Sequence, residues 1–91
     1  MDLDQEARTY LKRCGGFFEL YRVVMEFTGY RKRKDGESQL VTVQIRDMGP
    51  ENAQARYHVH AVSEDGKTAT GNGAPSIDIA MLTTHWQNLD S

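Results

Sequence analysis

The spacing of apolar residues predicts a helix at the start of the chain. One helical face gathers the apolar side chains of the first segment, which are Leu3, Ala7, Tyr10, Leu11 and Cys14. Gly15 and Gly16 follow, and glycine tolerates the left-handed conformation that often ends a helix. We therefore expect an N-terminal helix whose apolar face packs against the rest of the domain, with Cys14 buried there and unreactive.

Alternation of apolar and polar residues predicts extended strands in the middle of the chain. The alternating segments are 21–28, 41–46 and 57–62, and a short run at 67–70 follows the Asp65–Gly66 turn. We expect these segments to pair as antiparallel strands of one sheet.

The C-terminal segment predicts a helix that starts at Ser76 and continues to the end of the chain. Ser76 is a favourable N-cap residue, and Asp78 in the first turn suits the helix dipole. The apolar stripe expected to face the sheet contains Ile79, Leu82, Trp86 and Leu89. Ile77 and Met81 fall on the opposite side, so they are candidates for contact with a partner.

Together these elements predict an α+β fold with the order α-β-β-β(-β)-α in a single domain, residues 1–91. We expect an antiparallel three- to four-stranded sheet with two helices packed on one face. A chain of 91 residues buries only about 60–65% of its unfolded surface, so one two-layer core is the realistic limit. Whether segment 39–48 forms an extra strand stays open.

Composition and charge narrow the possible functions. Charged residues make up 26% of the chain, hydrophobic residues 38%, and the formal net charge is −2. This acidic balance disfavours a protein built mainly to hold nucleic acid. A single cysteine excludes an internal disulfide. The polar N-terminus does not read as a signal peptide and no apolar run would span a membrane, so we expect a cytoplasmic location.

The order of several short motifs resembles the double-stranded RNA-binding domain, a family with a helix, a three-stranded antiparallel sheet and a second helix. The matching segments, in order, are Tyr21–Val24 followed by Gly29, then 57–62, 65–67, 71–73 and Ser76–Ala80. The resemblance covers most of the chain. It implies the same fold and, through the family's basic side chains, binding to RNA.

Two departures from the family pattern weaken the RNA inference more than the fold inference. Segment 39–48 would be an extra strand between the family's first and second strands; either the protein has four strands or the match is shifted. Ile77 and Asp78 stand where the family presents lysines to phosphates, and Met81 replaces a third lysine. An aspartate at this helix start would repel a phosphate, and a shared fold does not imply a shared function.

The residues that could still contact RNA lie in the first helix and in the loop after the first strand. They are Arg8, Lys12, Tyr30, Arg31, Lys32, Arg33 and Lys34, with Tyr30 as a stacking surface. In the other interpretation, the basic run is a solvated turn whose charges keep a hairpin edge from aggregating.

Catalysis and metal binding have little support in the sequence. His58, His60 and His85 could ligate zinc, but their spacing indicates no fourth ligand. The Gly71–Gly73 run lacks the lysine of a phosphate loop, so we expect a backbone turn there. We therefore expect a non-catalytic interaction module with no cofactor, metal or small-molecule substrate. A protein partner or self-association is favoured, and weak binding of double-stranded or structured RNA is the alternative.

Overall fold

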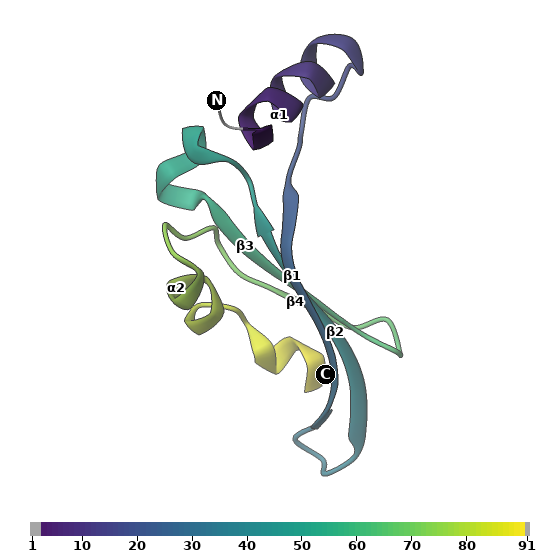
Figure 1. Ribbon diagram of the computed structural model, residues 1–91. Coiled ribbons are helices and arrows are strands. Elements are labelled where there is room, and N and C mark those ends of the chain that lie inside the picture. The colour runs from purple at the N-terminus through teal and green to yellow at the C-terminus, as the bar shows by residue number, and fades with distance from the viewer. Residues whose placement is uncertain (1–2, 91) are drawn as a thin grey trace.

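A computed structural model of the chain describes residues 3–90 and shows an α+β fold (Figure 1). The helices are α1 (Leu3–Cys14) and α2 (Ile77–Leu82), and the strands are β1 (Arg22–Lys32), β2 (Ser38–Asp47), β3 (Tyr57–Ser63) and β4 (Thr68–Thr70). Two 3₁₀ helices, η1 (Pro50–Ala55) and η2 (Trp86–Asp90), follow β2 and α2. The predicted order α-β-β-β-β-α is confirmed.

The four strands form one antiparallel sheet in which each strand pairs with the next, in the order β1-β2-β3-β4. The β1–β2 and β3–β4 turns contain Gly36 and Gly66, with φ of +90° and +85°. Glycine adopts this left-handed conformation without a steric penalty. The question of an extra strand is settled, because segment 39–48 lies almost entirely in β2, between β1 and β3.

The hydrophobic core lies on one face of the sheet, beneath the C-terminal elements. Alternate residues of the two central strands are buried there, as their sequence pattern predicts: Val41, Ile45, Val59 and Ala61. Helix α2 packs on β3, and η2 packs on β4. This arrangement places Ala80 and Leu89 against the strands as the buried residues of the covering layer.

The C-terminal helix is shorter than expected, and part of its predicted apolar stripe is wrong. Helix α2 ends at Leu82, and the Thr83 and Thr84 hydroxyls donate to the carbonyls of Ile79 and Ala80. Such local bonds offer the backbone an alternative to a continued helix. Trp86 and Leu89 do pack on the core, but from the separate helix η2.

The break in the helix also reverses the expected roles of four side chains. Ile77 and Met81 pack against the core cluster instead of facing away from it. Ile79 and Leu82 are exposed, Leu82 by 82%. The prediction that Ile77 and Met81 face away from the core is therefore wrong, because α2 buries the face that carries Ala80. Their contact with a partner stays a prediction.

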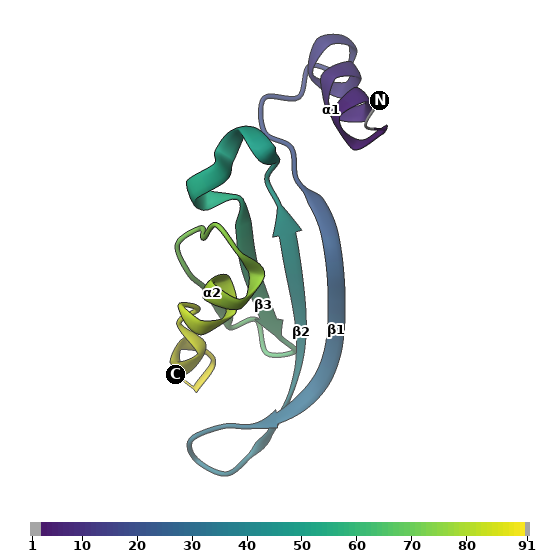
Figure 2. The same cartoon turned by 60° about the vertical axis from the view of Figure 1, so that its left-hand side comes forward.

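Helix α1 does not join α2 on the face of the sheet, so the expected two-helix layer is absent from the described residues. It lies beyond the end of the sheet, near the start of β1 (Figures 1 and 2). The Arg8 guanidinium donates to the Asp47 carbonyl at 2.8 Å, and Lys12 pairs with Glu51 at 3.4 Å. The radius of gyration is 15.2 Å, against about 12 Å for a compact chain of this length.

Candidate interaction surface

Strand β1 forms one edge of the sheet and is exposed along nearly its whole length, with Arg31 alone half-buried. Its exposed large apolar residues are Val23, Val24, Met25, Phe27 and Tyr30, and Phe27 is 57% exposed. An antiparallel sheet commonly packs one face on a core and leaves the other in water. Here β1 contributes apolar side chains that the described part of the chain does not cover.

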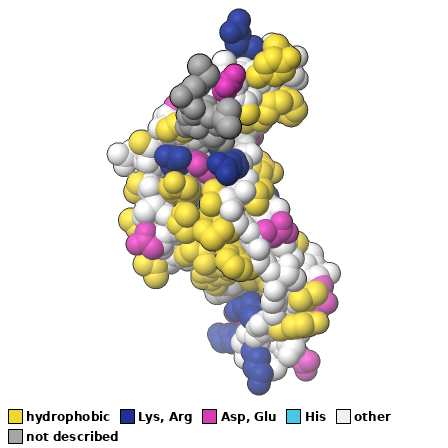
Figure 3. All heavy atoms as spheres, viewed as in Figure 1, with side chains coloured by type: hydrophobic (Ala, Val, Ile, Leu, Met, Phe, Trp, Pro, Cys, Tyr) yellow, Lys and Arg dark blue, Asp and Glu magenta, His cyan; other side chains and the backbone are white. Residues whose placement is uncertain are grey.

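The strand register shows which of these side chains extend the core face. Met25 pairs with Ile45 and Phe27 with Val43, and directly opposite residues point to the same face. The covering elements α2 and η2 pack on β3 and β4. Met25 and Phe27 therefore extend the apolar face of the sheet beyond the part that these elements cover. Figure 3 shows hydrophobic side chains gathered over the middle of the molecule.

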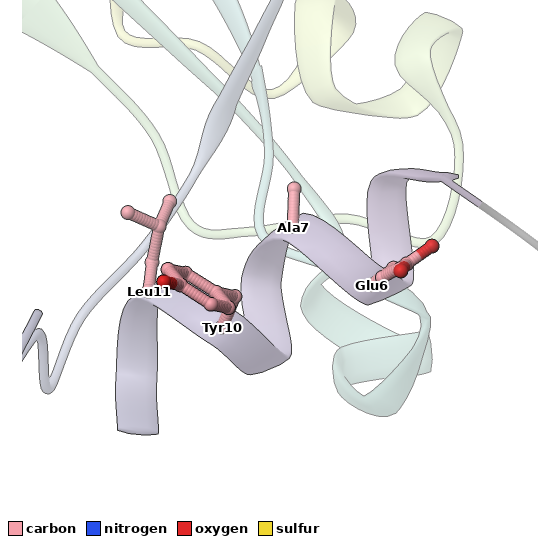
Figure 4. Close-up of a pocket in the computed structure, with 4 residues that line it drawn as sticks. All are labelled: Glu6, Ala7, Tyr10 and Leu11. Atoms are coloured by element: carbon pink, nitrogen blue, oxygen red, sulfur yellow. The ribbon is translucent and has the colours of Figure 1, made fainter. Parts of the chain in front are cut away.

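Helix α1 presents a second apolar surface, next to the first residues of β1. Tyr10 is 68% exposed, and Ala7 and Leu11 are exposed as well. An open hollow of 510 Å³ lies beside them, lined by Glu6, Ala7, Tyr10 and Leu11 (Figure 4). In that view Ala7 and Leu11 point to the same side of the helix, so the face predicted to be buried is displayed instead.

These two regions are joined by a segment that is itself apolar and exposed, since Phe17 and Phe18 both face solvent. We call the whole set the α1–β1 apolar surface. It consists of Tyr10, Leu11, Phe17, Phe18, Tyr21, Val23, Val24, Met25 and Phe27. This set spans both faces of β1, since Tyr21 and Val23 lie beside Arg46, on the opposite face from Met25 and Phe27. Monomeric proteins seldom expose a contiguous apolar patch larger than a few hundred Å², and larger ones mark interaction sites.

The two edges of the sheet differ in how they are protected. Strand β4 has three residues, and η2 packs against it. Strand β1 has eleven residues, and its only β-strand neighbour among residues 3–90 is β2. A long exposed edge strand offers a row of backbone donors and acceptors to another chain. Strand β1 therefore combines an open edge with apolar side chains.

The basic run at the far end of β1 is largely committed to contacts within the domain. Arg31 donates to Asp90 at 3.0 Å and to Gln39 at 2.9 Å. The hydrogen bond from Arg31 holds the pKa of Asp90 below its usual range. Arg33 pairs with Asp35 and Asp65. Tyr30, Lys32 and Lys34 keep exposed side chains.

The predicted RNA-binding residues of the first helix lie far from this hairpin. Arg8 is only 5% exposed, so the prediction that it adds to a basic surface is wrong. Its side chain is used to anchor α1 to the end of β2. Lys12 pairs with Glu51. The part of β1 that precedes Arg31 separates this end from the Arg31–Lys34 run by about 30 Å, so the set does not form a single basic face.

The Gly71–Gly73 run serves close packing of the backbone. Neither glycine has a positive φ. A Cβ on Gly73 would lie 2.5 Å from Nε2 of His58 and 2.8 Å from the Ala55 carbonyl oxygen, and one on Gly71 would lie 2.8 Å from the Thr83 carbonyl oxygen. The run therefore lets the loop lie against β3 and the end of α2.

Substituting Gly73→Ala should destabilise the domain by about 1–3 kcal/mol, because the methyl group would overlap neighbouring atoms that cannot all move away. Gly29→Ala is the matched control, since a Cβ at Gly29 meets nothing within 4 Å and its φ is not positive. Urea unfolding of both variants measures the difference. Equal stability of the two would show that the loop is not tightly packed.

The histidines and the cysteine form no reactive cluster. Among residues 3–90, no group of three His, Cys, Asp or Glu side chains could hold a metal ion. Burial and the nearby Arg46 guanidinium lower the pKa of His60 below its ordinary value. Cys14 is exposed, which corrects the expectation that α1 buries it.

Comparison with models of protein families, with curated proteins and with solved structures finds no match to this chain. Within the described residues, none of the helices is both long and apolar enough to cross a membrane.

Proposed function

We propose that this domain is a non-catalytic interaction module that binds another polypeptide through the α1–β1 apolar surface. The observation that carries the proposal is the exposure of Met25 and Phe27 on an open edge strand. A polypeptide can use both features at once, because backbone groups pair with the edge while side chains meet the apolar face. Nucleic acid has no backbone amides with which to extend the sheet edge.

Binding to RNA is the weaker alternative for this chain. Nucleic-acid affinity is dominated by cations that displace counterions from phosphates. Arg31 and Arg33 are paired with carboxylates, and Arg8 is buried. Lys32 and Lys34 remain, beside the exposed ring of Tyr30. A domain of net charge −2 with two free lysines at one hairpin has little to hold a duplex.

A photoreactive phenylalanine analogue at position 27 tests the proposal in cells that make the protein. We expect a covalent adduct with a polypeptide when cells are irradiated, since Phe27 is exposed in the middle of the open edge strand. The same analogue at Leu82 is the control, because that side chain is even more exposed but lies on α2. Adducts of equal yield at the two positions, or adducts with RNA alone, would contradict the proposal.

A further inference from the structure

We infer that the polypeptide bound by the α1–β1 apolar surface is a second copy of this chain, joined through antiparallel pairing of the two β1 strands. This inference rests on the proposed function and names its partner. Two-fold symmetry places equivalent edge strands side by side in opposite directions, so the open edges complete one another. The result is a continuous eight-stranded sheet, four strands from each copy.

The area of the surface matches what a stable dimer requires. With about 150–250 Å² for a large apolar side chain, the exposed fractions of its members amount to roughly 700–1,200 Å². A specific, stable interface buries about 800 Å² on each partner. A surface of this extent and apolar character would promote aggregation of a protein that stayed monomeric.

The shape of the strand favours pairing along its full length. Phe27 is the midpoint of β1 (Arg22–Lys32), so a two-fold axis there overlaps all eleven residues of both strands. The two Phe27 side chains then meet on the face that continues each core, where Met25 also lies. Aromatic pairs of this kind stabilise a sheet across neighbouring strands.

The antiparallel arrangement also accounts for the position of helix α1. In an antiparallel pair, the start of each strand lies beside the end of the other. Helix α1 of each copy is therefore brought beside the hairpin of its partner. The detached position of α1 is then explained, because its apolar face is presented to the second copy.

Sedimentation equilibrium of the purified full chain tests the inference. The apparent mass of the wild-type protein should rise from 10.3 kDa toward twice that value as its concentration increases. Phe27→Lys should raise the dissociation constant of the dimer by roughly tenfold or more, because lysine at the interface centre must lose its hydration. Leu82→Lys, an equally large change outside the surface, should leave the dissociation constant unchanged. Val24→Lys is a second interface variant.

Circular dichroism shows whether each variant is folded. Phe27 and Val24 are both exposed, so the two interface variants should keep the wild-type fold. A wild-type chain that stays at 10.3 kDa at every concentration overturns the inference. So does dimerisation that Phe27→Lys and Val24→Lys leave intact. If the chain is monomeric while the photoreactive residue at position 27 still captures a different protein, the inference of a second copy is wrong and the proposed function stands. If capture fails too, both are wrong.

Discussion

Substituting Leu89→Ala should lower the free energy of unfolding by about 2–5 kcal/mol, the largest single effect on stability that we expect. The Leu89 side chain is fully buried, at 0% exposed, and packs against Val41, Ala61 and Ala69. Truncation removes apolar contact and leaves a cavity among side chains too small to fill it. For a domain of this length the midpoint of thermal unfolding should fall by about 10 °C or more.

The matched control for this change is Leu82→Ala, the same substitution seven residues earlier. Leu82 is 82% exposed, so its loss should alter stability by no more than about 0.5 kcal/mol. Thermal and urea unfolding should be compared at one protein concentration, because association with a second copy would raise the apparent stability. Similar losses at the two positions would mean that the C-terminal segment is one continuous helix.

Removal of the Asp47 carboxylate is expected to be the next most damaging change. Its two oxygens accept from Arg56 at 2.8 and 2.9 Å, and Oδ1 also accepts the Gly49 backbone N–H at 2.9 Å. Asp47 is buried, while Arg56 is about one-third exposed and can regain water. Asp47→Ala should therefore cost about 2–3 kcal/mol, measured by urea unfolding at pH 7. A loss below 0.5 kcal/mol, which is about the usual effect of a surface substitution, would contradict this role.

The same carboxylate makes the stability depend on pH. The hydrogen bonds from Arg56, followed by the Gly49 N–H, hold the pKa of Asp47 below its ordinary value of 3.8. Because the folded-state pKa is the lower one, its contribution is fully present above about pH 4. It is lost as the pH falls from that value through the folded-state pKa. Asp47→Asn should lack this dependence, so the stability difference from wild type should shrink below pH 4.

The strands were predictable from the sequence because each carries its own local signal. Val41, Ile45, Val59 and Ala61 alternate with polar neighbours, and the structure buries all four. Glycine at the turns marks where the chain reverses. A buried face with a period of two residues fixes both the strand and its orientation. It did not fix the number of strands, which the structure supplies.

The helices were harder to place, because their packing depends on what lies opposite them. Leu82 fits the spacing of a core stripe, yet the helix ends there and η2 supplies Leu89 from a different direction. The apolar face of α1 likewise indicated a buried helix. Periodicity shows that a face is apolar and does not show whether this chain or another covers it.

Hydrogen exchange of the β1 backbone amides tests the central claim, that β1 is an interface strand, most directly. Wild-type protein should be compared at low and high concentration, with the amides of β3, paired on both sides, as the internal reference. We expect exchange along β1 to slow as concentration rises while that of β3 stays constant, and we expect Phe27→Lys to remove the change. Exchange along β1 that is equally fast at both concentrations would contradict pairing of two copies.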